Sequence, residues 1–380
     1  MKTVRLLIAA AALGTVLISV HAVPLHAQPA WSVIMSGLDN PRGLTFVRTG
    51  DDGDDGGHGW ALYVAEAGKG GPGPCALLLG VFQCVGPTGA VSRYHRGHQE
   101  RVVTGLPSYA PPETGAGANG PSDVSFAHGR GYVTIGLGGP LSPVETRALI
   151  GDSFGWIVRF RPNGRWAFDT DVASYEQEVN PGGGTIESNP AGLLKGAGRA
   201  ILIDTSANAL LHISPRRRIT TIAIFPSRAQ GRRTDAVSDS VARGPDGAYY
   251  VGEFTGEPFE LGAANVWRVV PGQEPQIYCA GFNFIADLDF DRRGNLYVLE
   301  YVSVPFTEPF PVGPGTLYRV GRACSRTPVI TGLTTPTAVA IGPDGDAYIS
   351  NFGTSSPGTG EVIRVHLGGG GDHAEDDEEN

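Results

Sequence analysis

The stretch Gly244-Pro-Asp-Gly-Ala-Tyr-Tyr-Val-Gly-Glu253 decides the fold. It recurs in drifted form as Asp291-Arg-Arg-Gly-Asn-Leu-Tyr-Val-Leu-Glu300 and as Gly342-Pro-Asp-Gly-Asp-Ala-Tyr-Ile-Ser-Asn351. Each copy is a turn rich in Pro, Asp or Gly that leads into a β-branched and aromatic strand ending on a polar residue. An apolar strand precedes each turn, so each copy predicts a β-hairpin. These preceding strands are Asp239–Arg243, Ala286–Phe290 and Pro336–Ile341.

The strand after the turn can be aligned at six places along the chain, and a third strand follows each of them. The six aligned segments are Tyr63–Glu66, Tyr132–Ile135, Ile201–Asp204, Tyr250–Glu253, Tyr297–Glu300 and Tyr348–Asn351. The third strands are Val91–Arg93, Val158–Phe160, Leu211–Ile213, Trp267–Val269, Tyr318–Val320 and Ile363–Val365. A fourth strand is readable at Val102–Leu106, Ile277–Phe282 and Val329–Leu333. Four antiparallel strands repeated in this way are typical of a β-propeller. The sequence therefore predicts an all-β fold, a six-bladed β-propeller of four-stranded blades.

The two ends of the repeat region predict how the ring closes. The region opens with Val33–Leu38, which matches a fourth strand, and ends at Val365, in a third strand. We expect the N-terminal strand to complete the last blade, so that no sheet edge stays free there. The propeller domain is predicted over 31–367. An open two-sheet sandwich is the alternative, but a sandwich has no reason to repeat one four-strand unit six times.

The first residues have the pattern of a secretory leader. Lys2 and Arg5 precede an apolar run over Leu6–Val20, and Leu25-His-Ala27 resembles a cleavage site, with Ala22 as an earlier option. The run is shorter than a typical membrane span of ~20 residues. We predict a signal peptide over 1–27, a secreted, periplasmic or extracellular protein, and no integral membrane segment after the leader is removed. An uncleaved membrane anchor is the alternative.

Export permits disulfides, and the chain has four cysteines. Cys75 and Cys84 flank a short apolar loop, a spacing that suits a local bridge, and Cys279 and Cys324 would then pair across neighbouring repeats. Four cysteines allow three connectivities, and the sequence does not choose among them. No Cys-x-x-Cys pair is present, which excludes a zinc knuckle or a thioredoxin-like motif.

Composition and charge exclude several classes of partner. The chain of 380 residues has 56 Gly and 29 Pro, and its formal net charge is −9. Nothing in this balance suggests binding to nucleic acid or to an anionic membrane surface. We expect a monomer whose partner is an unknown small molecule or protein. The Gly-rich and acidic tail, 368–380, is predicted to be disordered.

Several motifs resemble the ScyD/ScyE family of exported proteins. They are Tyr63-Val-Ala-Glu-Ala-Gly68, Gly86-Pro-Thr-Gly-Ala-Val91, Arg101-Val-Val-Thr-Gly-Leu-Pro107, Tyr132-Val-Thr-Ile-Gly-Leu-Gly-Gly139, Ser188-Asn-Pro190 and Tyr249-Tyr-Val-Gly-Glu253. The resemblance covers nearly all of the mature chain. It implies a six-bladed propeller related to NHL-repeat and SMP-30-like proteins, and it implies no established catalytic activity. The Asp/Gly insertion at 51–57 and the acidic tail depart from the family's pattern.

Polar residues recur where the first strand of a blade begins and where the second strand ends. In an antiparallel blade these two points lie side by side near the central channel. The first set is Arg42, Asp123, Asn189, Asp239 and Asp287, and the second is Glu66, Asp204, Glu253, Glu300 and Asn351. Their oxygen atoms could bind Ca²⁺, which takes six to eight such ligands, with Glu66, Asp123, Asn189, Asp204, Asp239, Glu253, Asp287 and Glu300 as the candidate metal ligands. The alternative is that these residues end strands and bond to turn backbone.

Other candidate motifs point less clearly to chemistry. Gly151-Asp-Ser-Phe-Gly155 matches the nucleophile-elbow string, but that motif needs a helix after Ser153 and none is readable there. The Asp51–Asp55 run lacks the ligand spacing of an EF-hand. Arginines that recur on the third strands are interpreted as solvated or paired between blades, and His95 and His98 as surface residues of a hairpin turn.

The function that these patterns favour is ligand or partner binding. We predict an exported propeller that binds at one face of the central channel without catalysis of its own. One alternative is a metal-dependent hydrolase, lactonase-like, in which the channel acids act on a metal-bound water. The other is a structural or assembly protein of the cell envelope.

Overall fold

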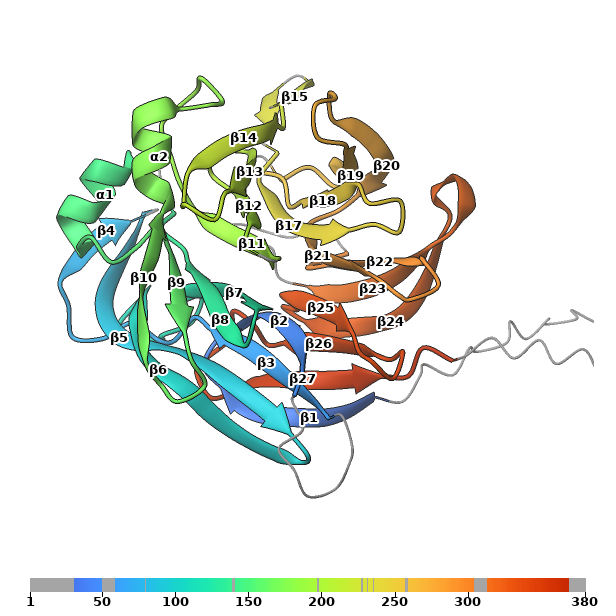
Figure 1. Cartoon of the computed structure of the whole chain (residues 1–380), viewed down its shortest axis with the longest axis horizontal. Helices are drawn as coiled ribbons and strands as arrows, with labels where there is room; N and C mark the ends of the chain where they lie inside the picture. Colours follow the sequence, from blue (N-terminus) through green and yellow to red (C-terminus); the bar gives the residue numbers. More distant parts are fainter. Residues whose placement is uncertain are drawn as a thin grey trace, which may run out of the picture.

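Strands arranged in a ring make up nearly all of the structure, a computed structural model (Figure 1). It describes residues 31–49, 59–78, 80–138, 141–196, 198–226, 228–230, 232–234, 236–256, 259–303 and 313–368. The predicted leader, the Asp51–Asp55 run and the tail after Gly368 lie outside these ranges. The strands run from Trp31 to Val365.

Six sheets form the blades, and each takes four antiparallel strands. Blade 1 contains β2 (Pro41–Arg48), β3 (Trp60–Glu66), β5 (Val81–His95) and β6 (His98–Ala110), with β4 (Cys75–Leu78) added against β5. Blade 2 contains β7 (Pro121–Ala127), β8 (Arg130–Ile135), β9 (Trp156–Phe160) and β10 (Trp166–Asp171). Blade 3 contains β11 (Pro190–Lys195), β12 (Ala200–Asp204), β13 (Ala209–Ile213) and β14 (Ile219–Ile224).

The second half of the ring repeats this plan. Blade 4 contains β17 (Ser238–Arg243), β18 (Tyr249–Glu253), β19 (Ala264–Val269) and β20 (Gln276–Phe282). Blade 5 contains β21 (Ile285–Phe290), β22 (Leu296–Glu300), β23 (Pro314–Val320) and β24 (Arg326–Thr334). Blade 6 contains β25 (Ala338–Ile341), β26 (Ala347–Asn351), β27 (Gly360–Val365) and β1 (Trp31–Leu38). A short hairpin of β15 (Arg228–Gln230) and β16 (Arg232–Thr234) lies between blades 3 and 4 in the chain.

The first strand of the chain closes the ring, as the sequence predicts. β1 pairs antiparallel with β27, with Trp31 opposite Val365 and Leu38 opposite Gly360. Met35 and Leu38 are fully buried and pack with Leu44 of the first blade. The N-terminal strand therefore joins the last blade to the first.

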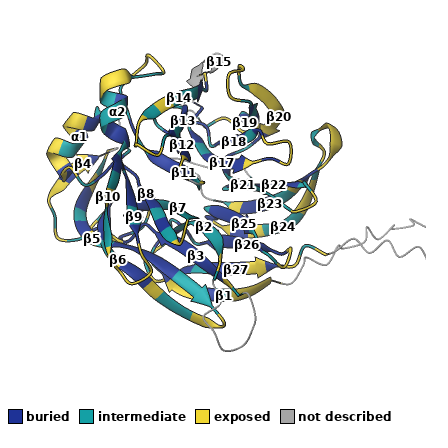
Figure 2. Ribbon diagram, viewed as in Figure 1, coloured by how far each residue is buried: buried dark blue, intermediate teal, exposed yellow. Residues whose placement is uncertain are grey.

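The hydrophobic core is divided among the gaps between neighbouring blades. Inner strands contact one another in the order β2, β7, β11, β17, β21 and β25, and β25 returns to β2. Six main clusters of buried apolar side chains fill the six interfaces between blades. Figure 2 shows the buried residues within the blades and the exposed ones on outer strands and loops. Stability thus depends on contacts between neighbours around the ring, as in other repeat proteins.

The recurring turn and the recurring arginine are partners within one blade. Asp246, in the turn before β18, lies 2.7 Å from the guanidinium of Arg268 on β19. Asp344 lies 2.8 Å from Arg364 in the equivalent places of blade 6. The expectation that these arginines pair between blades was wrong for these two, because the turn returns its acid beside the third strand. The pairs are partly exposed, so each contributes little to stability.

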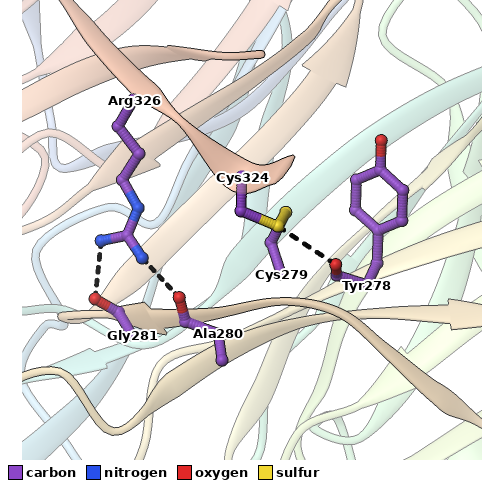
Figure 3. The surroundings of a disulfide bond; sticks show 6 residues. All are labelled: Tyr278, Cys279, Ala280, Gly281, Cys324 and Arg326. Atoms are coloured by element: carbon purple, nitrogen blue, oxygen red, sulfur yellow. Dashed lines mark hydrogen bonds between the residues drawn. A yellow bond between two sulfur atoms is a disulfide. The ribbon is translucent and has the colours of Figure 1, made fainter. Parts of the chain in front are cut away.

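Two disulfides are present, in the pairing that the cysteine spacing suits. Cys75 joins Cys84 across the β4–β5 hairpin. Cys279 of β20, in blade 4, joins Cys324 of the short 3₁₀ helix η1 (Arg322–Cys324), in blade 5 (Figure 3). This second disulfide therefore links the two blades. Beside this bridge Arg326 Nη1 donates to the carbonyl oxygen of Gly281 at 2.6 Å. The outer edges of these two blades are therefore held covalently and by hydrogen bonds.

Two helices belong to the segment around blade 2: one lies between β8 and β9, and the other follows β10. α1 (Pro143–Ile150) begins at a capping box, in which the Ser142 hydroxyl accepts from Glu145 N and the Glu145 carboxylate accepts from Ser142 N. α2 (Val172–Val179) has Asp171 as its N-cap. Ser153 lies in the turn between α1 and β9, so the element that follows it is a strand and not a helix. The nucleophile-elbow geometry is absent from this segment.

Candidate functional site

The two predicted sets of polar residues do meet at one face of the ring. We call this the top face, the face where first strands begin and second strands end. In the β-sheet register Pro190 lies opposite Asp204, Ser238 opposite Glu253 and Ile285 opposite Glu300. Each second-strand acid is therefore next to the start of the first strand of its own blade.

The second-strand acids of blades 1 and 4 are bound inside their own blades. Glu66 accepts hydrogen bonds from Asp39 N at 2.7 Å and from Arg101 Nη2 at 2.6 Å. Glu253 accepts from Trp267 Nε1 at 2.6 Å. The side-chain donors to these two carboxylates, Arg101 and Trp267, lie on strands farther from the axis of the ring. The carboxylates of Glu66 and Glu253 therefore do not converge on that axis.

The same arrangement recurs in blades 3 and 5. Asp204 accepts from Asn189 N and from Ser188 Oγ, both at 2.6 Å. Glu300 accepts from Asn283 N at 2.9 Å. These acids therefore fix the backbone that enters the first strand, which is the capping alternative considered for them. Asn351 does the same through Thr334 N at 2.9 Å.

Asn189 belongs to a network between loops of blades 1, 2 and 3. Its Oδ1 accepts from Leu137 N at 3.1 Å. Leu137 O in turn accepts from the Tyr109 hydroxyl and, at 3.2 Å, from Asn119 Nδ2. The side chain that was a candidate metal ligand thus holds a loop in place.

The first-strand acids Asp123 and Asp287 bind the next blade. Asp123 Oδ2 accepts from Leu193 N, on the first strand of blade 3, at 2.7 Å. Asp287 Oδ2 accepts from Val339 N, on the first strand of blade 6, at 2.9 Å. Each also accepts the N–H of the residue that follows it, at 2.7 and 2.8 Å. They join neighbouring inner strands.

Sequence reasoning missed Asp289, which repeats this contact one step along β21. Its carboxylate accepts from Ile341 N at 2.8 Å and from Phe290 N at 2.7 Å. The alternation Asp287-Leu-Asp289 was the available signal, because residues two apart on a strand share a face. Ser125 Oγ accepts from Lys195 N at 2.9 Å in the corresponding position of blade 2.

Burial controls the charge of the axial acids. Burial, with a smaller contribution from the charge of Asp239, raises the pKa of Asp123 to about 7. Burial also holds the pKa of Asp287 well above its usual value, with the charge of Asp123 contributing. All three side chains are nevertheless partly exposed, since they lie on the inner strands of the ring. Asp123, Asp239 and Asp287 therefore interact across the axis.

Arg42 is the cation of this group. Burial lowers the pKa of its guanidinium, and the neighbouring Tyr301 and Asp239 oppose that shift. Its Nη2 donates to Ala118 O at 2.8 Å, and no other hydrogen bond of its side chain is formed within the described ranges. Arg42 is partly exposed, so its remaining N–H groups are open to a bound molecule.

Aromatic rings stand beside this group on the top face. Tyr301 packs on Phe254, with ring centroids 5.5 Å apart, and Phe254 packs on Phe284 at 5.5 Å. The Tyr301 hydroxyl is hydrogen-bonded to Thr354 Oγ1 at 2.6 Å. A site of a few polar groups beside aromatic rings is the usual composition of a small-molecule site.

The axial acids do not make up a complete metal site. Within the described residues no group of three or more His, Cys, Asp or Glu side chains gathers closely enough to hold an ion. Asp123 and Asp287 already accept two backbone hydrogen bonds each, and Arg42 places a positive charge among them. A Ca²⁺ ion would have to share these carboxylates with their backbone partners and with Arg42, so we derive no catalytic step through a metal.

The raised pKa values predict that the fold weakens as pH rises. The pKa of Asp123 lies near 7 and that of Asp204 near 6 in the folded protein, mainly through burial, against an ordinary 3.8. Protonation therefore favours the folded state, and this contribution is lost as pH rises from about 4 to 7. We expect the free energy of unfolding in urea to fall over this range. Asp123→Asn should flatten the profile, whereas Asp152→Asn, at an exposed turn, should leave it unchanged.

Comparisons with known proteins confirm the architecture alone. No protein-family model matches the sequence, and no curated protein matches it. A structural genomics protein of unknown function from Bacteroides thetaiotaomicron shares 9% identity, with a TM-score of 0.50 over 89% of this chain and 72% of the other. A putative gluconolactonase shares 10% identity, with a TM-score of 0.48 over 90% and 93%.

A catalytically inactive virginiamycin B lyase from Staphylococcus aureus, solved with quinupristin, is a further similar structure. It shares 11% identity, with a TM-score of 0.44 over 89% of this chain and 98% of the other. Across the described residues no helix is long and apolar enough to cross a membrane. The chain is a six-bladed β-propeller.

Proposed function

We propose that the protein binds a small polar organic ligand on the top face, at the axis of the ring. Arg42 donates to an oxygen of the ligand, Asp239 accepts from a hydroxyl or amine, and Phe254 and Tyr301 cover its apolar part. The observation that supports this most is the partly exposed Arg42, which keeps unused donors although protein surrounds it. A partly exposed cation with unused donors has more to gain from a ligand than one whose donors are all bonded within the protein.

The neighbourhood of Asp239 supports the same ligand chemistry. Its Oδ1 accepts from Thr205 Oγ1 at 3.1 Å. Burial raises the pKa of Asp239, whereas the Thr205 hydroxyl and the charge of Arg42 oppose the shift. An acceptor and a donor side by side match a ligand that carries both, such as a hydroxy acid or a sugar acid.

Thermal shift measurements with a panel of hydroxy acids, sugar acids and aromatic glycosides test this proposal. A ligand that binds the folded protein raises the melting temperature in a concentration-dependent way. The shift should disappear in Arg42→Gln and in Asp239→Asn, and it should persist in Arg199→Gln, which changes an exposed cation at the other end of blade 3. Shifts that survive both axial substitutions would place the ligand elsewhere and refute the proposal.

Calcium is a second candidate ligand for the same site. The repulsion among Asp123, Asp239 and Asp287 favours it, because a cation would relieve that repulsion. We expect Ca²⁺ to raise the melting temperature of the wild type and a chelator to reverse the effect. Asp123→Asn combined with Asp239→Asn should abolish the response, whereas Asp204→Asn, whose carboxylate is bound inside blade 3, should retain it. Identical melting curves with calcium and with chelator would refute calcium binding.

The export of the protein and its family are also proposals. We propose that the chain is exported and belongs with the ScyD/ScyE proteins that its motifs resemble. Two disulfides support an oxidising compartment. Mass determination of the N-terminus of exported protein tests the leader, for which cleavage after Ala27 is expected. The lactonase-like alternative needs a metal-bound water, and the incomplete set of axial ligands gives it no support.

A further inference from the structure

A second polar site lies at the opposite end of blade 2. The β7–β8 turn and the β9–β10 turn line a cavity of about 460 Å³ that is widely open to solvent. Its lining is His128, Gly129, Arg130, Arg161, Pro162 and Asn163. Asp123 lies near the start of β7, whereas this cavity lies beyond the end of that strand. It is therefore separate from the axial site on the top face.

Two arginines of this cavity lie at opposite backbone positions, where β8 begins and β9 has just ended. Gly131 lies opposite Phe160 in the register of β8 and β9, which places Arg130 opposite Arg161 at the next position. Neither side chain forms an ion pair or hydrogen bond with any part of the chain that the structure describes. Like charges directly opposite on neighbouring strands destabilise a sheet. An anion between them would reverse the sign of that interaction.

An acid on the outer strand of blade 2 is already paired with other cations. Asp169, on β10, lies 3.3 Å from Arg217 Nη2 and 4.0 Å from Arg159 Nη1. Arg159 lies on β9, and Arg161 directly follows the end of that strand. Asp169 is thus already shared by two other cations. The local surplus of positive charge stands out in a chain whose formal net charge is −9.

Asn163 adds a neutral donor to this lining. Its Oδ1 accepts from Arg165 N at 3.3 Å, which leaves the Nδ2 hydrogens available to the cavity. A guanidinium presents parallel N–H donors that match a phosphate or carboxylate oxygen pair. Two guanidinium groups together suit a dianion better than a single carboxylate, and a phosphomonoester carries about −1.5 to −2 charges at pH 7.

We propose that this cavity binds the phosphomonoester group of a small molecule. Arg130 and Arg161 hold the phosphate from two sides, and Asn163 and His128 complete its donors. The cavity volume falls within the range of about 300–1,000 Å³ typical of small-molecule sites, so the rest of a phosphorylated monosaccharide also fits. This binding is additional to the function proposed for the top face.

Isothermal titration of the whole chain tests the proposal, with inorganic phosphate, glucose 6-phosphate and glucuronate as probes at one ionic strength. We expect one site that binds glucose 6-phosphate and is competed by inorganic phosphate. Arg130→Gln and Arg161→Gln should each weaken binding about tenfold or more, since each removes a charge-assisted hydrogen bond. Arg199→Gln, an exposed arginine that precedes the second strand of blade 3, should bind like the wild type.

A second readout separates ligand binding from a structural role. Without ligand, Arg130→Gln should melt at the same or a higher temperature than the wild type, because it removes the repulsion from Arg161. The proposal fails if neither phosphate nor glucose 6-phosphate binds saturably. It also fails if glucuronate binds as tightly as glucose 6-phosphate, or if Arg199→Gln weakens binding as much as Arg130→Gln. These last two outcomes would indicate a general carboxylate site and diffuse charge attraction, respectively.

Discussion

Deletion of β1, Trp31–Leu38, is expected to lower the unfolding temperature of the whole propeller more than any point substitution. The deletion removes the two fully buried side chains Met35 and Leu38, whose burial contributes about 1.5–3 kcal/mol each. It also leaves β27 as an unpaired edge, which exposes its N–H and C=O groups to association. Circular dichroism during heating would measure the loss, and light scattering would report the expected aggregation.

Two point substitutions in the same strand provide a matched control. Met35 is 1% exposed, whereas Val33 is 47% exposed. Met35→Ala should cost about 2–5 kcal/mol of unfolding free energy. Val33→Ala should stay within about 0.5 kcal/mol of the wild type. If the β1 deletion unfolds like the full chain, the strand does not close the ring in solution.

Asp287→Ala is expected to be the most damaging substitution on the inner strands. It leaves the N–H groups of Leu288 and Val339 without their acceptor between blades 5 and 6. An unsatisfied buried donor costs about 1–3 kcal/mol, so the two together cost about 2–6 kcal/mol. Urea unfolding monitored by tryptophan fluorescence would measure the change in unfolding free energy.

The chain offers two comparisons for this substitution. Asp287→Asn keeps one acceptor oxygen, so it should lose less stability than Asp287→Ala. Asp152→Ala removes an exposed carboxylate in the turn after α1 and should be nearly neutral. Equal midpoints for Asp287→Ala and Asp152→Ala would show that the carboxylate does not hold the two blades together.

The blades could be predicted because each hairpin carries its own local pattern. A Pro, Asp or Gly turn between two apolar strands is readable within ten residues, as in Gly244–Glu253, and repetition makes it stronger. The helices were missed because each is short and lies inside a segment that reads as a loop. Ser142-Pro-Val-Glu145 was the signal for α1, since it has the capping-box spacing.

The sequence predicted where the polar residues of the candidate site lie, but it predicted only part of what their side chains bind. The two sets of polar residues meet on the top face because strand order alone determines that placement. Their partners depend on segments far away in the chain: Asp123 binds a backbone group 70 residues later and Asp287 one 52 residues later. No local pattern reveals such contacts. The cavity at Arg130 and Arg161 was missed for the same reason, since two separate turns form it.

The pairing of β1 with β27 has a consequence for the order of folding. Trp31 meets Val365, so this contact spans nearly the whole propeller, and closing so long a loop is slow compared with forming a hairpin. Blades 1 to 5 contain only consecutive segments and are able to form as the chain emerges. Met35 and Leu38 pack between blade 6 and blade 1, so their full burial needs both blades. We therefore expect ring closure to be the last step of folding, through an open intermediate that exposes the apolar faces of the first and last blades together.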